Sequence, residues 1–158
     1  MNQHSTRRRK LLLAAAALPL AALAQSAGGK KTFVEVWKDP GCGCCKDWVT
    51  HLEQNGFVVQ VQGDRNDAMR AKLGIPAALA SCHTGVAGSY ALEGHVPARE
   101  IRRLLREKPE ALGLAVPGMP VGSPGMDGEV YGGRRDPFDV LLVLKTGGSR
   151  VFASYHKA

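Results

Sequence analysis

Three of the four cysteines of this chain fall within the short sequence Cys42-Gly43-Cys44-Cys45. Cys42 and Cys45 have the Cys-X-X-Cys spacing that is typical of a dithiol redox pair or of a metal site. Cys44 adds a thiol that a simple dithiol switch does not need. The extra sulfur therefore favours a soft metal ion as the ligand of this segment.

The elements that flank these cysteines place them at the start of a helix. Residues 33–38 have the composition of a strand, and Asp39-Pro40-Gly41 is typical of the turn that leaves it. In the segment that follows, apolar residues recur at the spacing of one helix face, and Asn55-Gly56 is a stop signal. We therefore expect Cys42 and Cys44 on the loop and the first turn of this helix. Exposed backbone N–H groups there stabilise a thiolate over a thiol.

The pattern that follows alternates between strands and helices. It predicts a strand over 57–61, a helix from Asn66 to Leu73, a hairpin formed by 85–87 and 90–93, and a helix that begins near Pro97. Together with the first strand and helix, this order is that of a thioredoxin-like domain, an α/β fold in which helices flank a mixed sheet.

The fourth cysteine lies in the loop that enters the third strand of this arrangement. In a thioredoxin-like domain that loop lies against the Cys-X-X-Cys loop, so we expect Cys82 beside the other cysteines. Taken alone, Cys82 would be a small buried side chain, but the fold favours a functional thiol. His83 follows it directly and could bind a metal or tune a thiolate. His95, at the end of the hairpin, is as compatible with a hydrogen bond to that turn as with ligation.

Residues 109–137 are rich in proline and glycine, so we expect a long ordered loop with little helix or long strand. This loop carries Met119 and Met126, whose thioethers suit Cu(I), although methionines more often serve in packing. Residues 138–158 predict a strand hairpin that completes the same domain and extends the sheet at one edge.

Residues 1–24 have the features of a cleaved export signal. Arg7-Arg8-Arg9-Lys10 precedes an apolar run of about fourteen residues, which ends at the small-X-small sequence Ala22-Leu23-Ala24. The run is shorter than the roughly 20 residues of a membrane-spanning helix, so we expect no stable membrane span after cleavage; a retained anchor is the alternative. The consecutive arginines are also typical of a twin-arginine signal. With 25–32 as a linker, the prediction is a periplasmic protein.

Composition limits the function classes. Removing residues 1–24 takes away four basic side chains, so the net charge of the 158-residue chain falls from +7 to +3, and nothing favours nucleic acid as a partner. Four cysteines in a small exported chain ordinarily suggest two disulfides. The adjacent pair Cys44 and Cys45, however, could bridge each other only with strain. The sequence contains no pattern that resembles a Ser-His-Asp triad, a phosphate-binding glycine loop or a paired-carboxylate site, so classical hydrolysis is set aside.

Four motifs occur in order along the chain: 39–46 (DPGCGCCK), 80–84 (ASCHT), 93–98 (EGHVPA) and 113–126 (GLAVPGMPVGSPGM). Together they resemble the exported CopG-like family of metal-binding proteins, a domain of unknown function associated with bacterial copper resistance. The resemblance runs from about Phe33 to Met126. It implies a thioredoxin-like fold, Cu(I) binding with a possible role in copper redox handling, and Cys42, Cys44, Cys45 and Cys82 as the core ligands. It leaves the roles of His83, His95, Met119 and Met126 open.

The physical chemistry of the donors agrees with that implication. Thiolates and thioethers select Cu(I), with Zn(II) as a competitor in tetrahedral sites. Three sulfurs within four residues cannot easily reach the corners around one ion, so a multinuclear Cu(I) cluster with bridging sulfurs suits them better. Two alternatives remain: a thiol-disulfide oxidoreductase that uses Cys42 and Cys45, and a copper chaperone. Either alternative would need a periplasmic redox or copper-transfer protein as its partner.

Overall fold

The structure of this protein, a computed structural model, describes residues 31–157. The predicted export signal and most of the predicted linker lie outside these residues. The first half of the described chain contains β1 (Phe33–Lys38), α1 (Gly43–Gln54), β2 (Val58–Gly63), α2 (Asn66–Lys72), a 3-10 helix η1 (Ala77–Leu79) and β3 (His83–Ala87). The second half contains β4 (Tyr90–Glu93), α3 (Ala98–Glu107), β5 (Ala111–Ala115), a 3-10 helix η2 (Glu129–Tyr131), β6 (Phe138–Leu144) and β7 (Ser149–Tyr155).

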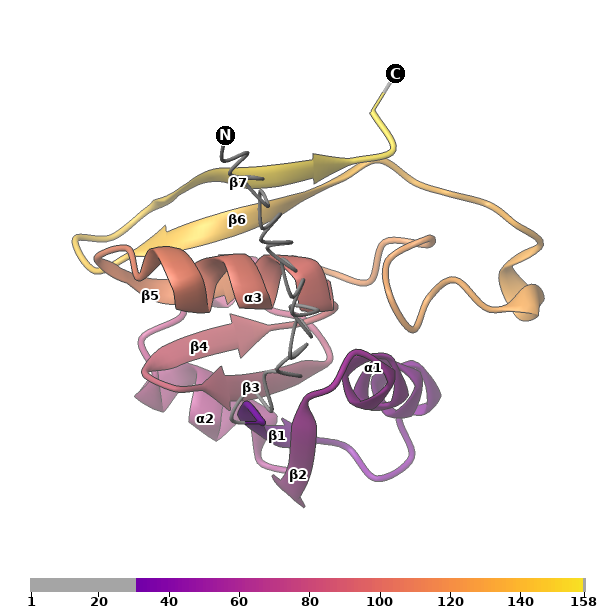
Figure 1. Ribbon diagram of the computed structural model, residues 1–158, viewed down its shortest axis with the longest axis horizontal. Helices are drawn as coiled ribbons and strands as arrows, with labels where there is room; N and C mark the ends of the chain where they lie inside the picture. Colours follow the sequence, from indigo (N-terminus) through magenta and orange to yellow (C-terminus); the bar gives the residue numbers. More distant parts are fainter. Residues whose placement is uncertain (1–30, 158) are drawn as a thin grey trace, which may run out of the picture.

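All seven strands belong to one mixed sheet in the order β2-β1-β3-β4-β5-β6-β7 (Figure 1). β1 is parallel to β2, and the chain returns antiparallel through β3 and β4. The run from β1 to α3 therefore has the thioredoxin-like order and strand directions that the sequence predicts. The sheet then continues through β5, which is parallel to β4, to the antiparallel hairpin of β6 and β7.

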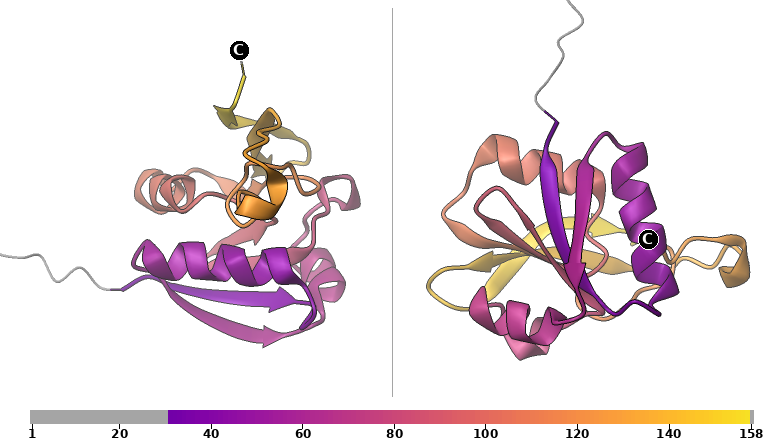
Figure 2. Two further views of the ribbon diagram at one scale, coloured as in Figure 1. Left: turned by 90° about the vertical axis from the view of Figure 1, so that its right-hand side faces the viewer. Right: turned by 90° about the horizontal axis from the view of Figure 1, so that it is seen from below.

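The sheet separates two apolar layers. Because successive side chains of a strand point to opposite faces, Leu92 of β4 joins the larger core while its neighbour Ala91 joins a smaller one. The larger core contains residues of α1 and α3, among them Trp48 and Ile101. The smaller core contains Ile75, from the segment that follows α2. Figure 2 shows α1 and α3 on one face of the sheet and α2 on the other.

The expectation of little regular structure in 109–137 is wrong at the start of that segment. Residues 111–115 form β5, which lies inside the sheet between β4 and β6. The buried residues of this strand are Ala111, Gly113, Leu114 and Ala115. Three of them are small, which allows the strand to pack closely in the middle of the sheet. The rest of the segment, from 116 to 137, contains only the short η2 and forms the irregular extension on the right of Figure 1. The predicted C-terminal hairpin is confirmed by β6 and β7.

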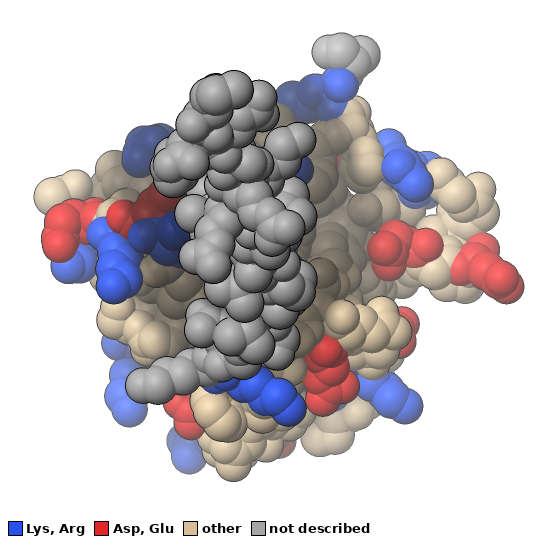
Figure 3. Space-filling model, viewed as in Figure 1, with Lys and Arg blue, Asp and Glu red and all other residues tan. Residues whose placement is uncertain are grey.

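Among residues 31–157 there is no helix whose length and apolar character would let it cross a membrane. Basic and acidic side chains are interspersed over the parts of the face that Figure 3 leaves uncovered by grey residues.

Candidate metal centre

The cysteine motif begins α1. Cys42 is the N-cap residue, and its sulfur accepts a hydrogen bond from the backbone N–H of Cys45 at 3.3 Å. The preceding turn is held by Asp39, whose carbonyl accepts from the N–H of Cys42 and whose carboxylate accepts from the N–H of Gly41. The prediction that Cys42 and Cys44 lie at the entrance of the helix is confirmed. Their sulfurs therefore lie in the positive field of the helix N-terminus.

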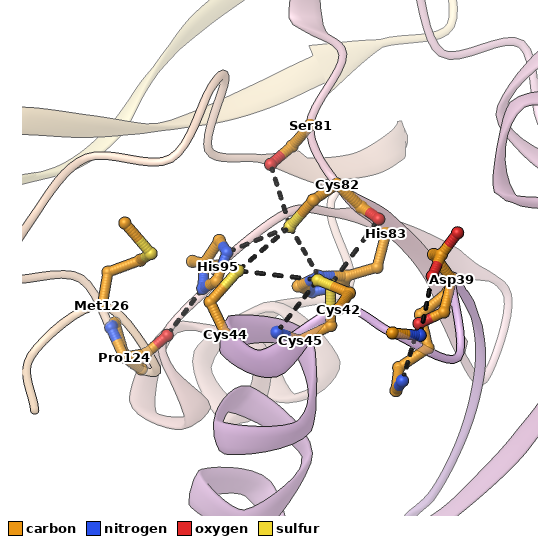
Figure 4. The surroundings of a disulfide bond; sticks show 12 residues. Asp39, Cys42, Cys44, Cys45, Ser81, Cys82, His83, His95, Pro124 and Met126 are labelled. Atoms are coloured by element: carbon orange, nitrogen blue, oxygen red, sulfur yellow. Dashed lines mark hydrogen bonds between the residues drawn. A yellow bond between two sulfur atoms is a disulfide. The ribbon is translucent and has the colours of Figure 1, made fainter.

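The structure brings the four cysteine sulfurs together (Figure 4). Cys42 and Cys45 form a disulfide, while Cys44 and Cys82 carry free thiols. The Cys44 sulfur lies 3.6 Å from that of Cys42 and 4.0 Å from that of Cys82. All four sulfurs lie within 4.8 Å of one another. Opening the disulfide would make all four available as thiolate donors at one place.

Cys82 lies beside the motif because hydrogen bonds to β4 and α2 fix the loop before β3. The buried carboxylate of Glu93 accepts hydrogen bonds from the Ser81 N–H and the Thr84 hydroxyl, each at 2.7 Å. Arg70 of α2 donates to Glu93 at 2.7 Å and to the Ser81 carbonyl at 2.9 Å. These bonds hold the residues on both sides of Cys82, so the direction of its side chain is set by β4 and α2.

Two histidines flank the Cys82 sulfur. Nδ1 of His83 lies 3.4 Å from it, and Nε2 of His95 lies 3.1 Å from it. Both imidazoles are fully buried. His83, a predicted ligand, is therefore placed at the site.

His95 is not among the predicted ligands, although the strand register of the hairpin indicates its position. The two-residue turn Gly88-Ser89 pairs Ala87 with Tyr90 and Thr84 with Glu93. Continuing that register by two residues sets Cys82 opposite His95. A tight hairpin thus converts a separation of thirteen residues into direct contact.

The extension that follows β5 packs directly on the cysteine helix. A Cβ added to Gly125 would lie 2.6 Å from the Cys44 carbonyl oxygen and 2.7 Å from the backbone nitrogen of Trp48. The φ of Gly125 is +85°, a conformation that other residues adopt only with strain. The carbonyl of the neighbouring Pro124 accepts a hydrogen bond from Nδ1 of His95 at 2.8 Å. The extension thereby encloses one side of the centre.

The two methionines of this extension lie in different surroundings. Met126 is buried, and its sulfur accepts a hydrogen bond from the Tyr131 hydroxyl at 3.1 Å. In Figure 4 it lies on the same side of the cysteines as His95. Met119 is 52% exposed. The burial of Met126 makes it the better placed of the two predicted thioether donors.

Burial controls the protonation of the centre. It raises the pKa of the Cys82 thiol to about 12, with the adjacent Cys44 contributing in the same direction. Burial also lowers the pKa of His83 to about 3 and holds that of His95 below its usual value. At neutral pH both imidazoles are therefore neutral and the metal-free Cys82 keeps its proton.

His51 of α1 is half-buried and accepts a hydrogen bond from the Ala98 N–H at 3.2 Å. It thereby caps α3, whose N-cap residue Pro97 provides no side-chain hydrogen bond.

Known proteins resemble this chain in sequence and in structure. A family model described as a protein of unknown function, DUF411, matches residues 79–126. Two solved structures, forms 1 and 2 of a copper resistance protein CopG, are each 45% identical to this chain and cover 80% of it. Form 2 is matched over 99% of its own chain with a TM-score of 0.74, and form 1 over 98% with a TM-score of 0.73. No curated protein gives a significant match.

Proposed function

This chain belongs to the CopG family of copper resistance proteins, and we propose that it is a periplasmic protein that binds Cu(I) through Cys42, Cys44, Cys45 and Cys82. The observation that carries the proposal is the convergence of four sulfurs within 4.8 Å. Soft sulfur donors select Cu(I) over harder ions. The crowding of sulfurs on one helix turn favours bridging thiolates and a multinuclear cluster, with Zn(II) as the competitor for a mononuclear site.

Competition against a chromophoric Cu(I) chelator tests this proposal on the reduced protein under anaerobic conditions. We expect more than one Cu(I) per chain, and Cys44→Ser should lower both the stoichiometry and the affinity. Thr50→Ser, an exposed change on the same helix, is the matched control and should leave both unchanged. Binding of less than one equivalent, or wild-type behaviour of Cys44→Ser, would overturn the proposal.

The Cys42–Cys45 disulfide favours a second candidate function, in which this cysteine pair is oxidised and reduced in turn. Closing this bond releases two electrons and two protons. In copper redox handling, two Cu(II) ions would take up these electrons, one each, and become Cu(I). In thiol exchange, a substrate disulfide would take up both electrons and both protons and become two thiols. The Cys44→Ser variant discriminates between them. Thiol exchange should survive this change, whereas copper reduction by a cluster that needs Cys44 should not.

The periplasmic location rests on the predicted signal and is tested separately. We expect the protein in the periplasmic fraction, with an N-terminal sequence that begins at Gln25. Recovery of the full-length chain from the membrane fraction would instead indicate a retained anchor. A redox or copper-transfer partner in the same compartment is part of this proposal, and faster copper transfer to an apo acceptor than to free chelator would support it.

A further inference from the structure

When the disulfide is closed, the donors that remain near Cys82 are of a different kind. Two of the four sulfurs are bonded to each other. Cys82 keeps its thiol, and the nitrogens of His83 and His95 lie 3.4 and 3.1 Å from its sulfur. The three donor atoms all lie within 4.8 Å of one another. In tetrahedral zinc sites the bond lengths to sulfur and nitrogen separate these donors by about 3.5 Å, so small side-chain rotations suffice to admit one ion.

The orientation of His95 is that of a metal ligand. Its Nδ1 lies 2.8 Å from the Pro124 carbonyl oxygen, which can only accept, so Nδ1 carries the proton. Nε2 therefore directs a lone pair toward the Cys82 sulfur. Histidines that bind metals usually donate their other N–H to a carbonyl or carboxylate in this way, which fixes the tautomer and the ring.

Nδ1 of His83 lies 3.4 Å from the Cys82 sulfur. Its Nε2 is buried and has no hydrogen-bond partner among residues 31–157. The ring lies 4.2 Å from the Trp48 ring, measured between centroids.

From this geometry we propose that Cys82, His83 and His95 form a second, mononuclear metal site that is present while Cys42 and Cys45 are bridged. One thiolate and two imidazoles suit a borderline divalent ion such as Zn(II), in contrast to the soft sulfur set proposed for Cu(I). Cys44, whose thiol is also free and lies 4.0 Å from that of Cys82, is the candidate for the fourth ligand. The protein would thus hold two classes of ion according to its thiol oxidation state.

Titration with Co(II), a coloured substitute for Zn(II), tests this site. The protein is prepared with two titratable thiols, so that the disulfide is closed, and is kept anaerobic. We expect one equivalent of Co(II) with a sulfur-to-cobalt charge-transfer band, and its displacement by Zn(II). Absence of the band in the wild-type protein would overturn the proposal.

Variants identify the ligands. Cys82→Ser should abolish the charge-transfer band from this sulfur, and His95→Gln should weaken Co(II) binding at least tenfold, in proteins whose circular dichroism remains native. His51→Gln is the matched control, because His51 is half-buried and bonded to Ala98 rather than to Cys82. Equal affinity of His95→Gln and wild type would refute the site. Cu(I) binding is measured on reduced protein, so either proposal can fail without the other.

Discussion

At neutral pH the metal-free Cys82 thiol holds its proton, because burial and the adjacent Cys44 raise its pKa to about 12. A metal ion must therefore displace that proton, so binding releases it to solvent. For each proton released below the pKa of its thiol, the affinity should rise about tenfold per pH unit. Cu(I) competition at pH 6, 7 and 8 should thus show tighter binding as pH rises. Cys82→Ser should lower the slope of log affinity against pH by about one proton. A flat profile in the wild-type protein would contradict this prediction.

Single residues also mark the limit of what the sequence reveals about the site. The crowding of Cys42, Cys44 and Cys45 is visible in the sequence because it is local. The approach of Cys82 is predictable because the thioredoxin-like order brings its loop to the helix N-terminus. His95 is harder to assign, because the sequence fits a bond to the turn equally well. Its Nδ1 bonds instead to Pro124 in the extension, and its Nε2 faces Cys82.

At the scale of elements, α2 and β4 position Cys82 through a buried ion pair. Arg70 and Glu93 contact at 2.7 Å, and Glu93 is fully buried. Removing Arg70 leaves that carboxylate without its charged partner, a loss that typically costs about 3–5 kcal/mol. We expect Arg70→Met and Glu93→Gln each to destabilise the protein, and the double variant to lose less than the sum. Urea unfolding in a double-mutant cycle measures this, and additive losses would count against the pairing.

The contact between the extension and α1 depends on Gly125. An alanine there would combine an unfavourable φ of +85° with overlap onto the Cys44 carbonyl and the Trp48 nitrogen. Gly118 has a similar φ of +68° but no atom within 4 Å of an added Cβ, so Gly118→Ala isolates the backbone strain, about 1–2 kcal/mol. We expect Gly125→Ala to lose more unfolding free energy than Gly118→Ala and to weaken Cu(I) binding. Equal losses would mean that the extension can move away from α1 freely.

At the scale of the whole molecule, the order from β1 to α3 is predictable because each element carries its own signal. Helical spacing of apolar residues marks α1 and α3, and a tight glycine turn marks the hairpin. β5 carries no such signal, because its sequence Ala-Leu-Gly-Leu-Ala is short and lies beside many prolines and glycines. It forms a strand because β4 and β6 pair with both of its edges. Tertiary pairing thus supplies what local propensity lacks.

The buried histidines make the stability of the metal-free protein depend on pH. Burial lowers the pKa of His83 to about 3 and lowers the pKa of His95 and His51 as well. Between pH 6.5 and 3 the unfolded chain therefore binds protons that the folded chain does not, so stability falls as the pH falls. Glu93, whose pKa is raised by burial, acts in the opposite direction from about pH 4.5 upward.

For His83 alone, the expected loss of unfolding free energy on going from neutral pH to pH 5 is about 2 kcal/mol. Urea unfolding of the disulfide-closed, metal-free protein at pH 7, 6 and 5 measures it. His83→Gln should lower the slope of unfolding free energy against pH by about one proton, while Thr50→Ser, an exposed change without a titratable group, is the control. The comparison of slopes holds even if His83→Gln lowers stability at every pH, because proton uptake sets the slope and not the intercept. If wild type and His83→Gln give parallel curves, the His83 imidazole accepts its proton equally well in the folded and unfolded chains.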